Sequence, residues 1–184
     1  MEETQVKRKG RIVKPRSRRP RRAREPQEFE QRILDLARVT RVTKGGKRMR
    51  FRVCLIIGDR KGRVGMGVAK GADVAIAVEK SFKQAKKNLV TVPLKDGTIP
   101  HVVRQKYGAA LVLLKPAPEG TGLKSGGAVR MVLEFAGVPN AVSKILGSSN
   151  KINNAKAAFA ALRALRQVPA ETKKPAAPKV EEKK

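Results

Sequence analysis

The uneven spread of charge along the chain limits where a fold can form. Residues 1–26 carry 11 Lys and Arg with 3 Glu, and residues 169–184 consist almost entirely of Pro, Ala, Lys and Glu. Segments of this kind have little apolar surface to bury, so we predict a disordered basic arm and a flexible tail. The packed part of the protein is therefore expected within residues 27–168.

This middle segment is itself strongly basic, with 27 Lys and Arg against 9 acidic residues and a net charge of +18. Such charge repels itself in a compact monomer, and a polyanion relieves the repulsion. Nucleic acid is the usual polyanion, and an anionic membrane surface is its competitor. The membrane alternative is the weaker one because no stretch reaches the ~20 apolar residues of a spanning helix. No apolar run follows the N-terminal charges, so we predict no secretory signal.

The cysteine and aromatic content gives further information on the cellular compartment and on the core. Cys54 is the only cysteine, so the chain holds no internal disulfide framework. This usage is typical of a cytosolic chain and also allows an organelle of bacterial descent. Aromatic residues make up only 3% and Trp is absent, so the core has to be aliphatic.

Hydrophobic periodicity predicts an α-β-β-β-α order in the first half. Met49, Phe51, Val53, Leu55 and Ile57 alternate with arginines, which predicts a half-buried strand with a basic outer edge. The other predicted elements are a helix over 28–38, a strand over 39–43, a turn over 58–62, a strand over 63–69 and a helix over 73–89. The apolar stripe of that second helix is Ala75, Val78, Phe82, Ala85 and Leu89.

The second half is predicted to mix short strands with two helices. Strands are expected over 90–92, 98–103, 109–114 and within 138–145, and helices over 128–135 and after the turn at 147–150. A Gly-rich stretch over 119–127 precedes the first of these helices. Its free N–H groups could bind an anion, or the glycines could serve only a tight turn, and the sequence leaves both open.

No catalytic or metal-binding constellation is evident in the sequence. His101 is the only histidine, and one His with one Cys cannot form a His/Cys metal cluster. The dinucleotide-binding fingerprint is not matched, because the spacing of Gly65, Gly67 and Gly71 is one residue too long. The phosphate-binding Walker A motif is not matched either, because Leu123 stands between its Gly and its Lys. We therefore expect no enzyme activity, no cofactor, no metal and no small-molecule substrate.

Three basic sets favour contact with RNA phosphates. They are the N-terminal arm, the 44–50 loop together with residues 60–63, and a lysine face on the 73–89 helix. Few aromatic residues are available for base stacking, which favours folded RNA recognised by shape. The predicted RNA-binding residues are Arg38, Arg41, Lys44, Gly45, Gly46, Lys47, Arg50, Arg60, Lys61, Arg63, Lys80, Lys83 and Lys87.

Several motifs, in order and at family spacing, resemble the bacterial small-subunit ribosomal protein five family over about residues 38–165. They include RVTRVTKGG at 38–46, PAPEGTG at 116–122, GGAVR at 126–130 and GSSN at 147–150. The resemblance implies an α+β fold with two domains. The first, over 27–92, would be an αβββα domain like those that bind double-stranded RNA. The second, over 93–168, would be an α/β sandwich with a left-handed β-α-β crossover.

The same resemblance implies partners and site residues. The partners would be 16S ribosomal RNA and ribosomal proteins four and eight, near the channel through which messenger RNA enters. The family helps hold the head and body of the small subunit in register and influences decoding accuracy. Val39, Thr40 and Arg41 match the loop linked to spectinomycin resistance, and Gly122 and Arg130 match the contact with protein four. The long basic arm and the Pro-Ala-Lys tail depart from the family pattern.

Two alternatives remain beside a structural ribosomal protein. A free RNA-binding protein or RNA chaperone would show the same charge and the same lack of catalytic groups. A phosphotransferase is the alternative from another class, because related α/β sandwiches host kinases with Gly-rich loops. That analogy rests on the fold alone.

Overall fold

The computed structural model describes residues 28–166, so the predicted arm at 1–26 and tail at 169–184 lie outside the described residues. The elements in chain order are β1 (Glu30–Thr43), β2 (Gly46–Gly58), β3 (Arg63–Gly71), α1 (Val74–Lys87), β4 (Leu89–Thr91), β5 (Val103–Tyr107), β6 (Ala110–Pro116), β7 (Leu123–Lys124), α2 (Gly127–Ala136), β8 (Ala141–Ile145) and α3 (Lys151–Ala164). One antiparallel sheet has the order β1-β2-β3-β4, and a second has the order β5-β6-β8-β7. The predicted two-part α+β architecture is confirmed.

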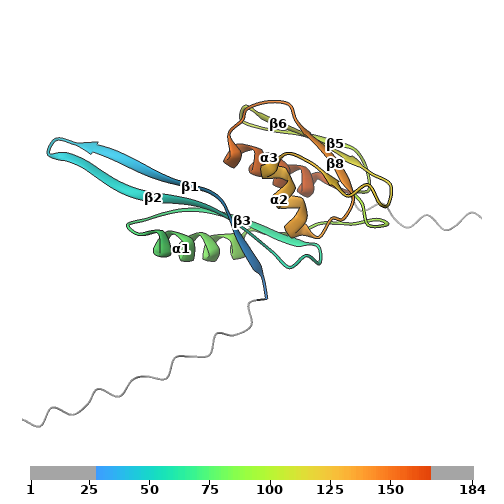
Figure 1. The fold of residues 1–184 in the computed structure, drawn as a ribbon, viewed down its shortest axis with the longest axis horizontal. Helices are drawn as coiled ribbons and strands as arrows, with labels where there is room; N and C mark the ends of the chain where they lie inside the picture. The colour runs from blue at the N-terminus through green and yellow to red at the C-terminus, as the bar shows by residue number, and fades with distance from the viewer. Residues whose placement is uncertain (1–27, 167–184) are drawn as a thin grey trace, which may run out of the picture.

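The elements stack in layers (Figure 1). Helix α1 covers one face of the first sheet, and α2 and α3 lie between its other face and the second sheet. Strands β7 and β8 pair in parallel on either side of α2 in the sequence, which makes a β-α-β unit. Two hydrophobic clusters follow from this layering, one under α1 and a larger one that includes residues of both halves.

The inner part of β2 contributes to both clusters. Val53, Leu55 and Ile57 face α1, whereas Cys54 and Ile56 face the second half of the chain. Every residue from Val53 to Gly58 is buried, so the half-buried strand predicted here is wrong for its inner part. The outer part, from Gly46 to Arg50, is exposed on both faces because nothing packs on it.

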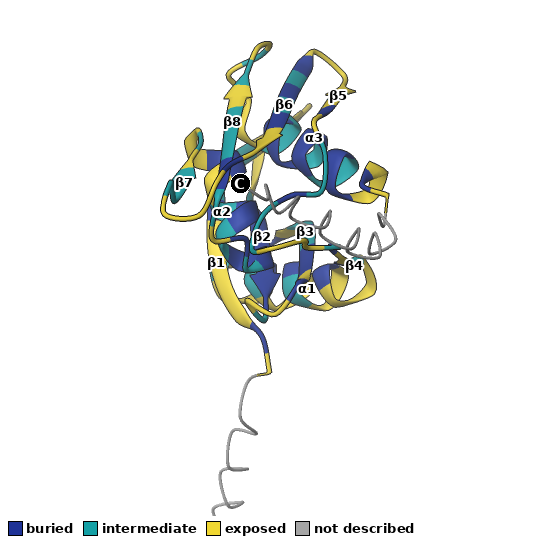
Figure 2. Ribbon diagram, turned by 90° about the vertical axis from the view of Figure 1, so that its right-hand side faces the viewer, coloured by how far each residue is buried: buried dark blue, intermediate teal, exposed yellow. Residues whose placement is uncertain are grey.

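The helix predicted over 28–38 is wrong, because these residues belong mainly to β1. Pairing with β2 runs from Glu30 opposite Gly58 to Thr43 opposite Gly46. A bulge between Ile33 and Asp35 interrupts the alternation, which hid the strand pattern in the sequence. β1 is an edge strand that stays exposed over most of its length (Figure 2). Within the described residues, the first half therefore begins with a strand.

The strand predicted over 98–103 is also wrong for most of its length. Thr98 makes only isolated bridges, to Lys95 and Asn140, and the regular strand β5 begins at Val103. Pro100 has no N–H to donate to a ladder, which accounts for the interruption. The strands predicted over 63–69, 90–92 and 109–114 and the helices over 73–89 and 128–135 are confirmed, within a few residues at their ends.

Helix α1 lies unusually close to β3. Its fully buried line is Ala77, Ser81 and Ala85, displaced from the predicted stripe, of which Ala75 is exposed. The Ser81 hydroxyl donates hydrogen bonds of 2.8 Å to the Ala77 carbonyl and 3.2 Å to the Val53 carbonyl. The glycines of β3 face this line of small side chains, and a Cβ added at Gly67 would overlap the Ser81 carbonyl oxygen. The glycine pattern of β3 therefore serves helix packing.

Replacing Gly67 with Ala is expected to lower the free energy of unfolding by roughly 3 kcal/mol, because the added methyl group meets helix backbone and α1 has to move. Gly127→Ala is the matched control, since an added Cβ there meets no atom within 4 Å and Ala favours the helix it would join. Urea denaturation of both variants measures the difference. Equal stability of the two variants would contradict the close packing of α1 on β3.

Candidate nucleic-acid interface

The paired strands β1 and β2 extend beyond both hydrophobic clusters as a two-stranded hairpin (Figure 1). We call residues 38–51 the hairpin. The tip, Thr43 to Gly46, is closed by a 3.0 Å hydrogen bond from the Thr43 hydroxyl to the Gly46 carbonyl. The predicted residues Lys44, Gly45, Gly46 and Lys47 are all exposed there. Even the apolar Val42 is 72% exposed, so no core holds this part of the chain.

One face of the hairpin and its root collects cationic side chains. Directly opposed residues of an antiparallel pair share a face, and Arg41 lies opposite Arg48, Val39 opposite Arg50, and Arg52 opposite Lys70. We call Arg41, Arg48, Arg50, Arg52 and Lys70 the basic face. Like charges directly opposite each other destabilise a strand pair, so the Arg41–Arg48 pairing works against the hairpin in isolation.

Few carboxylates neutralise the basic face. Arg52 Nη2 lies 3.3 Å from Asp35 Oδ2. Arg41, Arg48, Arg50 and Lys70 have no ion-pair partner within residues 28–166. A shallow groove is lined by Val39, Thr40, Arg41, Arg48, Arg50 and Lys70. Guanidinium groups gathered in this way suit the oxygen atoms of phosphates, which they can bind in a bidentate manner.

The sequence reasoning missed Arg52 and Lys70 as members of this face. Arg52 belongs to the alternating arginines of β2, so that alternation contained the signal. Lys70 joins them only through the register of β3 on β2, which the sequence did not reveal. Arg38 points to the opposite face, since it lies across from Phe51.

Val39, Thr40 and Arg41, expected in a loop by family resemblance, lie in the regular part of β1. Val39 and Arg41 share the basic face, whereas Thr40, which pairs with Met49, alternates to the other face although it also lines the groove. The two-residue connection at the tip is short enough that these residues stay paired. Their position two to four residues before the end of β1 still places them close to the tip.

Residues 60–63, which we expected beside the 44–50 segment, lie at the other end of β2. Arg60 Nη2 is 2.7 Å from Glu30 Oε2, and Arg63 Nε is 2.7 Å from Asp59 Oδ2. The backbone N–H of Arg60 donates to the Phe135 carbonyl (3.2 Å), and that of Gly62 donates to the Ala136 carbonyl (3.0 Å). The turn thus satisfies the last carbonyls of α2 and joins the two halves of the chain.

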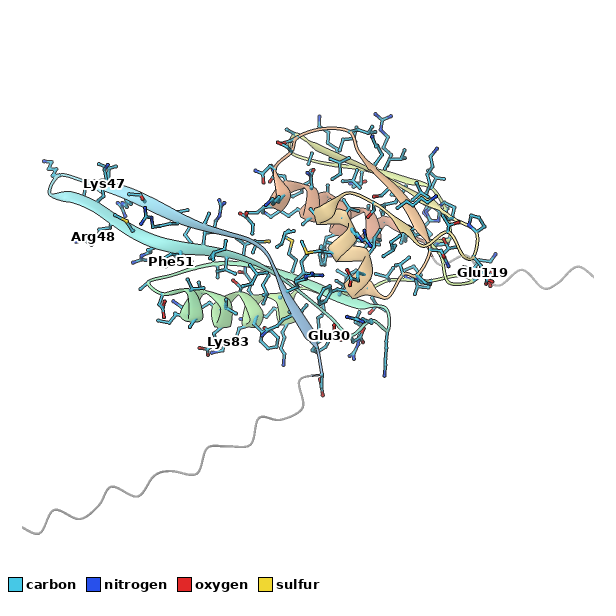
Figure 3. All side chains as sticks on the ribbon, viewed as in Figure 1. Glu30, Lys47, Arg48, Phe51, Lys83 and Glu119 are labelled. Carbon is cyan, nitrogen blue, oxygen red and sulfur yellow. The ribbon has the colours of Figure 1, made fainter. Side chains whose placement is uncertain are left out.

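Lys80, Lys83 and Lys87 are exposed on α1, and Figure 3 labels Lys83 there. Because α1 packs against Val53, Leu55 and Ile57, and side chains alternate along β2, α1 covers the face of the first sheet opposite to the basic face. Lys83 Nζ lies 2.7 Å from Glu79 Oε1, and this hydrogen bond, helped by the lysine charge, holds the pKa of the Glu79 carboxyl below its ordinary value. The predicted RNA-binding residues therefore occupy three separate places, namely the hairpin, the 60–63 turn and α1.

Gly122 and Arg130 lie close to a second, open groove. Gly122 adopts a left-handed φ of 69°, and its N–H donates to Asn140 Oδ1 at 2.9 Å. The exposed Arg130 lines the groove together with Arg60, Leu123, Glu134, Gly137, Val138 and Pro139. The structure thus brings Arg130 and the neighbourhood of Gly122 to one surface beside the 60–63 turn.

The remaining chemistry of the described residues is sparse. Burial, with a smaller contribution from the Asp35 charge, raises the pKa of the Cys54 thiol to about 11, so it stays protonated at neutral pH and serves packing. Residues 28–166 contain no group of three His, Cys, Asp or Glu side chains placed to hold a metal ion. In the same range, no helix has the length and apolar character needed to span a membrane.

Comparison with known proteins gives matches over both halves. Residues 29–93 match the family model described as ribosomal protein S5, N-terminal domain, and residues 105–174 match the C-terminal domain of the same description. Small ribosomal subunit protein uS5 of Synechococcus elongatus is 51% identical over 140 residues, covering 76% of this chain and 78% of that protein. The uS5 protein of Thermosynechococcus vestitus is 47% identical over 148 residues, covering 80% and 85%.

A longer relative matches equally well. Small ribosomal subunit protein uS5c of Spinacia oleracea is 51% identical over 140 residues, which is 76% of this chain. The matched part is only 46% of the spinach protein, so the chain spans less than half the length of that relative. The uS5c protein of Rhodomonas salina is 49% identical over 136 residues and is covered to 81%.

The 58–62 turn is expected to lose stability in acid. Burial alone would raise the pKa of Asp59. The carboxyl accepts hydrogen bonds from the Arg63 side chain and from the N–H groups of Lys61 and Arg63. Together with the Arg63 charge, these bonds hold the pKa of Asp59 below its ordinary value of 3.8. A lowered pKa stabilises the fold above pH 3.8, and this stability is lost as the pH falls through the folded value. Asp59→Asn should therefore lower the unfolding free energy by about 1 kcal/mol at pH 7.

The difference between the wild type and Asp59→Asn should shrink as the pH drops below 3.8, in denaturation curves recorded across the acid range. Glu119→Gln, an exposed carboxyl in the connection from β6 to β7, is the control and should change little. A difference that stays constant with pH would show that the Asp59 charge plays no part.

Proposed function

The chain belongs to the ribosomal protein S5 family, and from that membership we propose that it serves the small ribosomal subunit by holding folded 16S ribosomal RNA on the basic face of the hairpin. The observation that carries the proposal is the cross-strand pair Arg41–Arg48, followed by Arg50 and Lys70, with no neutralising carboxylate among the described residues. Phosphates are the ligand that turns this repulsion into attraction. The role is structural, without a catalytic step.

The shape of the hairpin suits a folded RNA more than a single strand. Cationic residues on one face of a strand recur about every 7 Å, in a row that can follow a phosphate backbone. The face has no aromatic side chain on which bases could stack, which a platform for single strands requires. The wide, shallow minor groove of A-form RNA and its flanking phosphates are open to such a row.

A free RNA-binding protein would use the same basic face, so this face alone does not distinguish it from a protein bound to the small ribosomal subunit. Family membership supports the small subunit, and the groove beside Arg130 gives a surface for a protein neighbour there. We propose that ribosomal protein four occupies this groove, that the contact contributes to decoding accuracy, and that the chain helps hold head and body in register. Co-sedimentation with small subunits in high salt separates the two candidates.

Neutralising the basic face should weaken RNA binding and its dependence on salt. The triple variant Arg41→Gln, Arg48→Gln, Arg50→Gln is expected to reduce the log–log salt slope by roughly 2–3, because each phosphate that a cation neutralises contributes about 0.7–0.9 to it. Its melting temperature should be unchanged or higher, since the opposed arginines repel each other. Filter binding of a 16S RNA fragment across a salt series measures the slope.

The matched control changes three exposed cations outside the hairpin, as Lys95→Gln, Lys151→Gln, Arg163→Gln. The two triple variants remove the same charge, so a general effect of net charge would appear equally in both. Slopes that fall equally would contradict the assignment of RNA to the basic face.

Changes at the second groove should raise misreading while subunits still assemble. Gly122→Arg meets no atom within 4 Å of the added Cβ, so its strain is confined to the left-handed backbone. Arg130→Leu removes an exposed fork of donors. A contact worth ~1.4 kcal/mol shifts a two-state balance about tenfold, enough to detect with a reporter of stop-codon readthrough.

Gly108→Arg is the control, because Gly108 has a similar left-handed φ of 58° in the distant turn between β5 and β6. It should leave the error rate unchanged. Normal accuracy in assembled subunits that carry Gly122→Arg or Arg130→Leu would refute the proposed contact with protein four.

A further inference from the structure

The second sheet has an outer face that none of the helices within residues 28–166 covers (Figure 1). Helices α2 and α3 lie on its inner side (Figure 1). The side chains of Ala110, Val112 and Leu114 on β6 are fully buried toward these helices. Because side chains alternate along a strand, Leu111, Leu113 and Lys115 point to the outer side.

The strand register gathers five cations on this outer face. Arg104 of β5 lies opposite Leu113, which lies opposite Lys144 of β8. Lys106 lies opposite Leu111, and Lys115 lies opposite Val142, whose other neighbour is Lys124 of β7. We call Arg104, Lys106, Lys115, Lys124 and Lys144 the outer basic face. Its five cations are exposed, whereas Leu111, Leu113 and Val142 between them are only partly buried.

The outer basic face is free of negative charge. None of the residues of β5, β6, β7 and β8 is an Asp or Glu, and none of the five cations has an ion pair among the described residues. Glu119 lies outside the strands, in the connection from β6 to β7 (Figure 3). A face that serves only solubility mixes both signs, whereas a face of one sign accumulates repulsion until an anion binds.

We propose that the outer basic face is a second RNA-binding surface, which contacts the phosphate backbone of an RNA segment other than the one on the hairpin. The proposal shares its ligand class with the proposed function and adds a separate site. An acidic protein fits less well, because lysine is depleted at protein interfaces and aromatic residues are enriched there, and this face has four lysines and no aromatic. The absence of an aromatic also disfavours stacked single strands.

The two surfaces belong to different layers of the molecule. The basic face lies on the hairpin and its root, where the first sheet extends beyond α2 and α3, and the outer basic face lies on the second sheet, on the side away from these helices (Figure 1). Neither set depends on the other for folding, because the two sets lie on separately hydrogen-bonded sheets and, apart from the partly exposed Arg52, consist of exposed side chains. Two such surfaces on one rigid chain raise the avidity for an RNA whose segments fit both.

The test uses the full chain and an RNA duplex of about 16 base pairs, close to the length that one double-stranded-RNA-binding domain contacts. In the background of the hairpin triple variant, Lys106→Gln, Lys115→Gln, Lys144→Gln is added. The salt slope is expected to fall by a further 2 or so, because each phosphate that a lysine neutralises contributes about 0.7–0.9. The melting temperature is expected to stay unchanged, since the three side chains are exposed.

The control adds Lys95→Gln, Lys151→Gln, Arg163→Gln to the same background and should lower the slope much less. A fall no larger than that of the control overturns the proposal. The hairpin triple variant and the Lys106/Lys115/Lys144 change are also each measured alone in the otherwise wild-type protein, which separates the two sites. If the hairpin triple variant has no effect there while the Lys106/Lys115/Lys144 change does, the proposed function of the hairpin fails and the outer basic face stands.

Discussion

Burial of the inner part of β2 on both faces determines how the rest of the molecule is arranged. Val53, Leu55 and Ile57 close the cluster under α1, while Cys54 and Ile56 belong to the cluster shared with the second half. One strand therefore holds both cores at a fixed spacing, with no flexible linker between them at this point. The hairpin is the outward continuation of this strand and its partner β1, so its root is fixed on both sides while its outer part is exposed.

The exposed hairpin combines features that would be unfavourable in a protein acting alone. Arg41 opposes Arg48, Val42 is 72% exposed, and Met49 is 52% exposed. Elsewhere the described residues place arginines beside carboxylates, as in Arg60–Glu30 and Arg63–Asp59. Among residues 28–166, the ion pairs lie at the hairpin root, around the 58–63 turn, on α1 and between β1 and α2, and none involves a residue of the hairpin. That distribution is expected when the stabilising partner of the hairpin is an external polyanion.

The sequence was informative where periodicity reflects burial and failed where pairing overrides it. Helix α2 and strands β3 and β6 were predicted because their apolar residues face a core. The part of β1 up to Arg38 was predicted as a helix because Ile33, Leu34 and Ala37 have helical spacing. Only the long-range pairing with β2 and the bulge before Asp35 make it a strand, whereas residues 39–43 were predicted as a strand. The basic residues were recognised by type, but their grouping depends on strand register, which placed Lys70 with the hairpin and moved residues 60–63 to the far end of β2.

The hydrogen bonds between the 58–62 turn and the end of α2 connect the proposed RNA-binding surface on the hairpin with the proposed protein-binding groove. Gly137 ends α2 in a left-handed conformation with φ of 76°, and a Cβ there would overlap the Arg60 carbonyl oxygen. Backbone N–H groups of the turn bond the last α2 carbonyls, so the end of β2 and the groove beside Arg130 move together unless these bonds break. On the proposed function, RNA bound at the hairpin and a protein bound at the groove are held at a distance that this chain sets. A chain without a catalytic step can influence accuracy in this way, because a change in the relative position of its neighbours has to strain or release one of the two contacts.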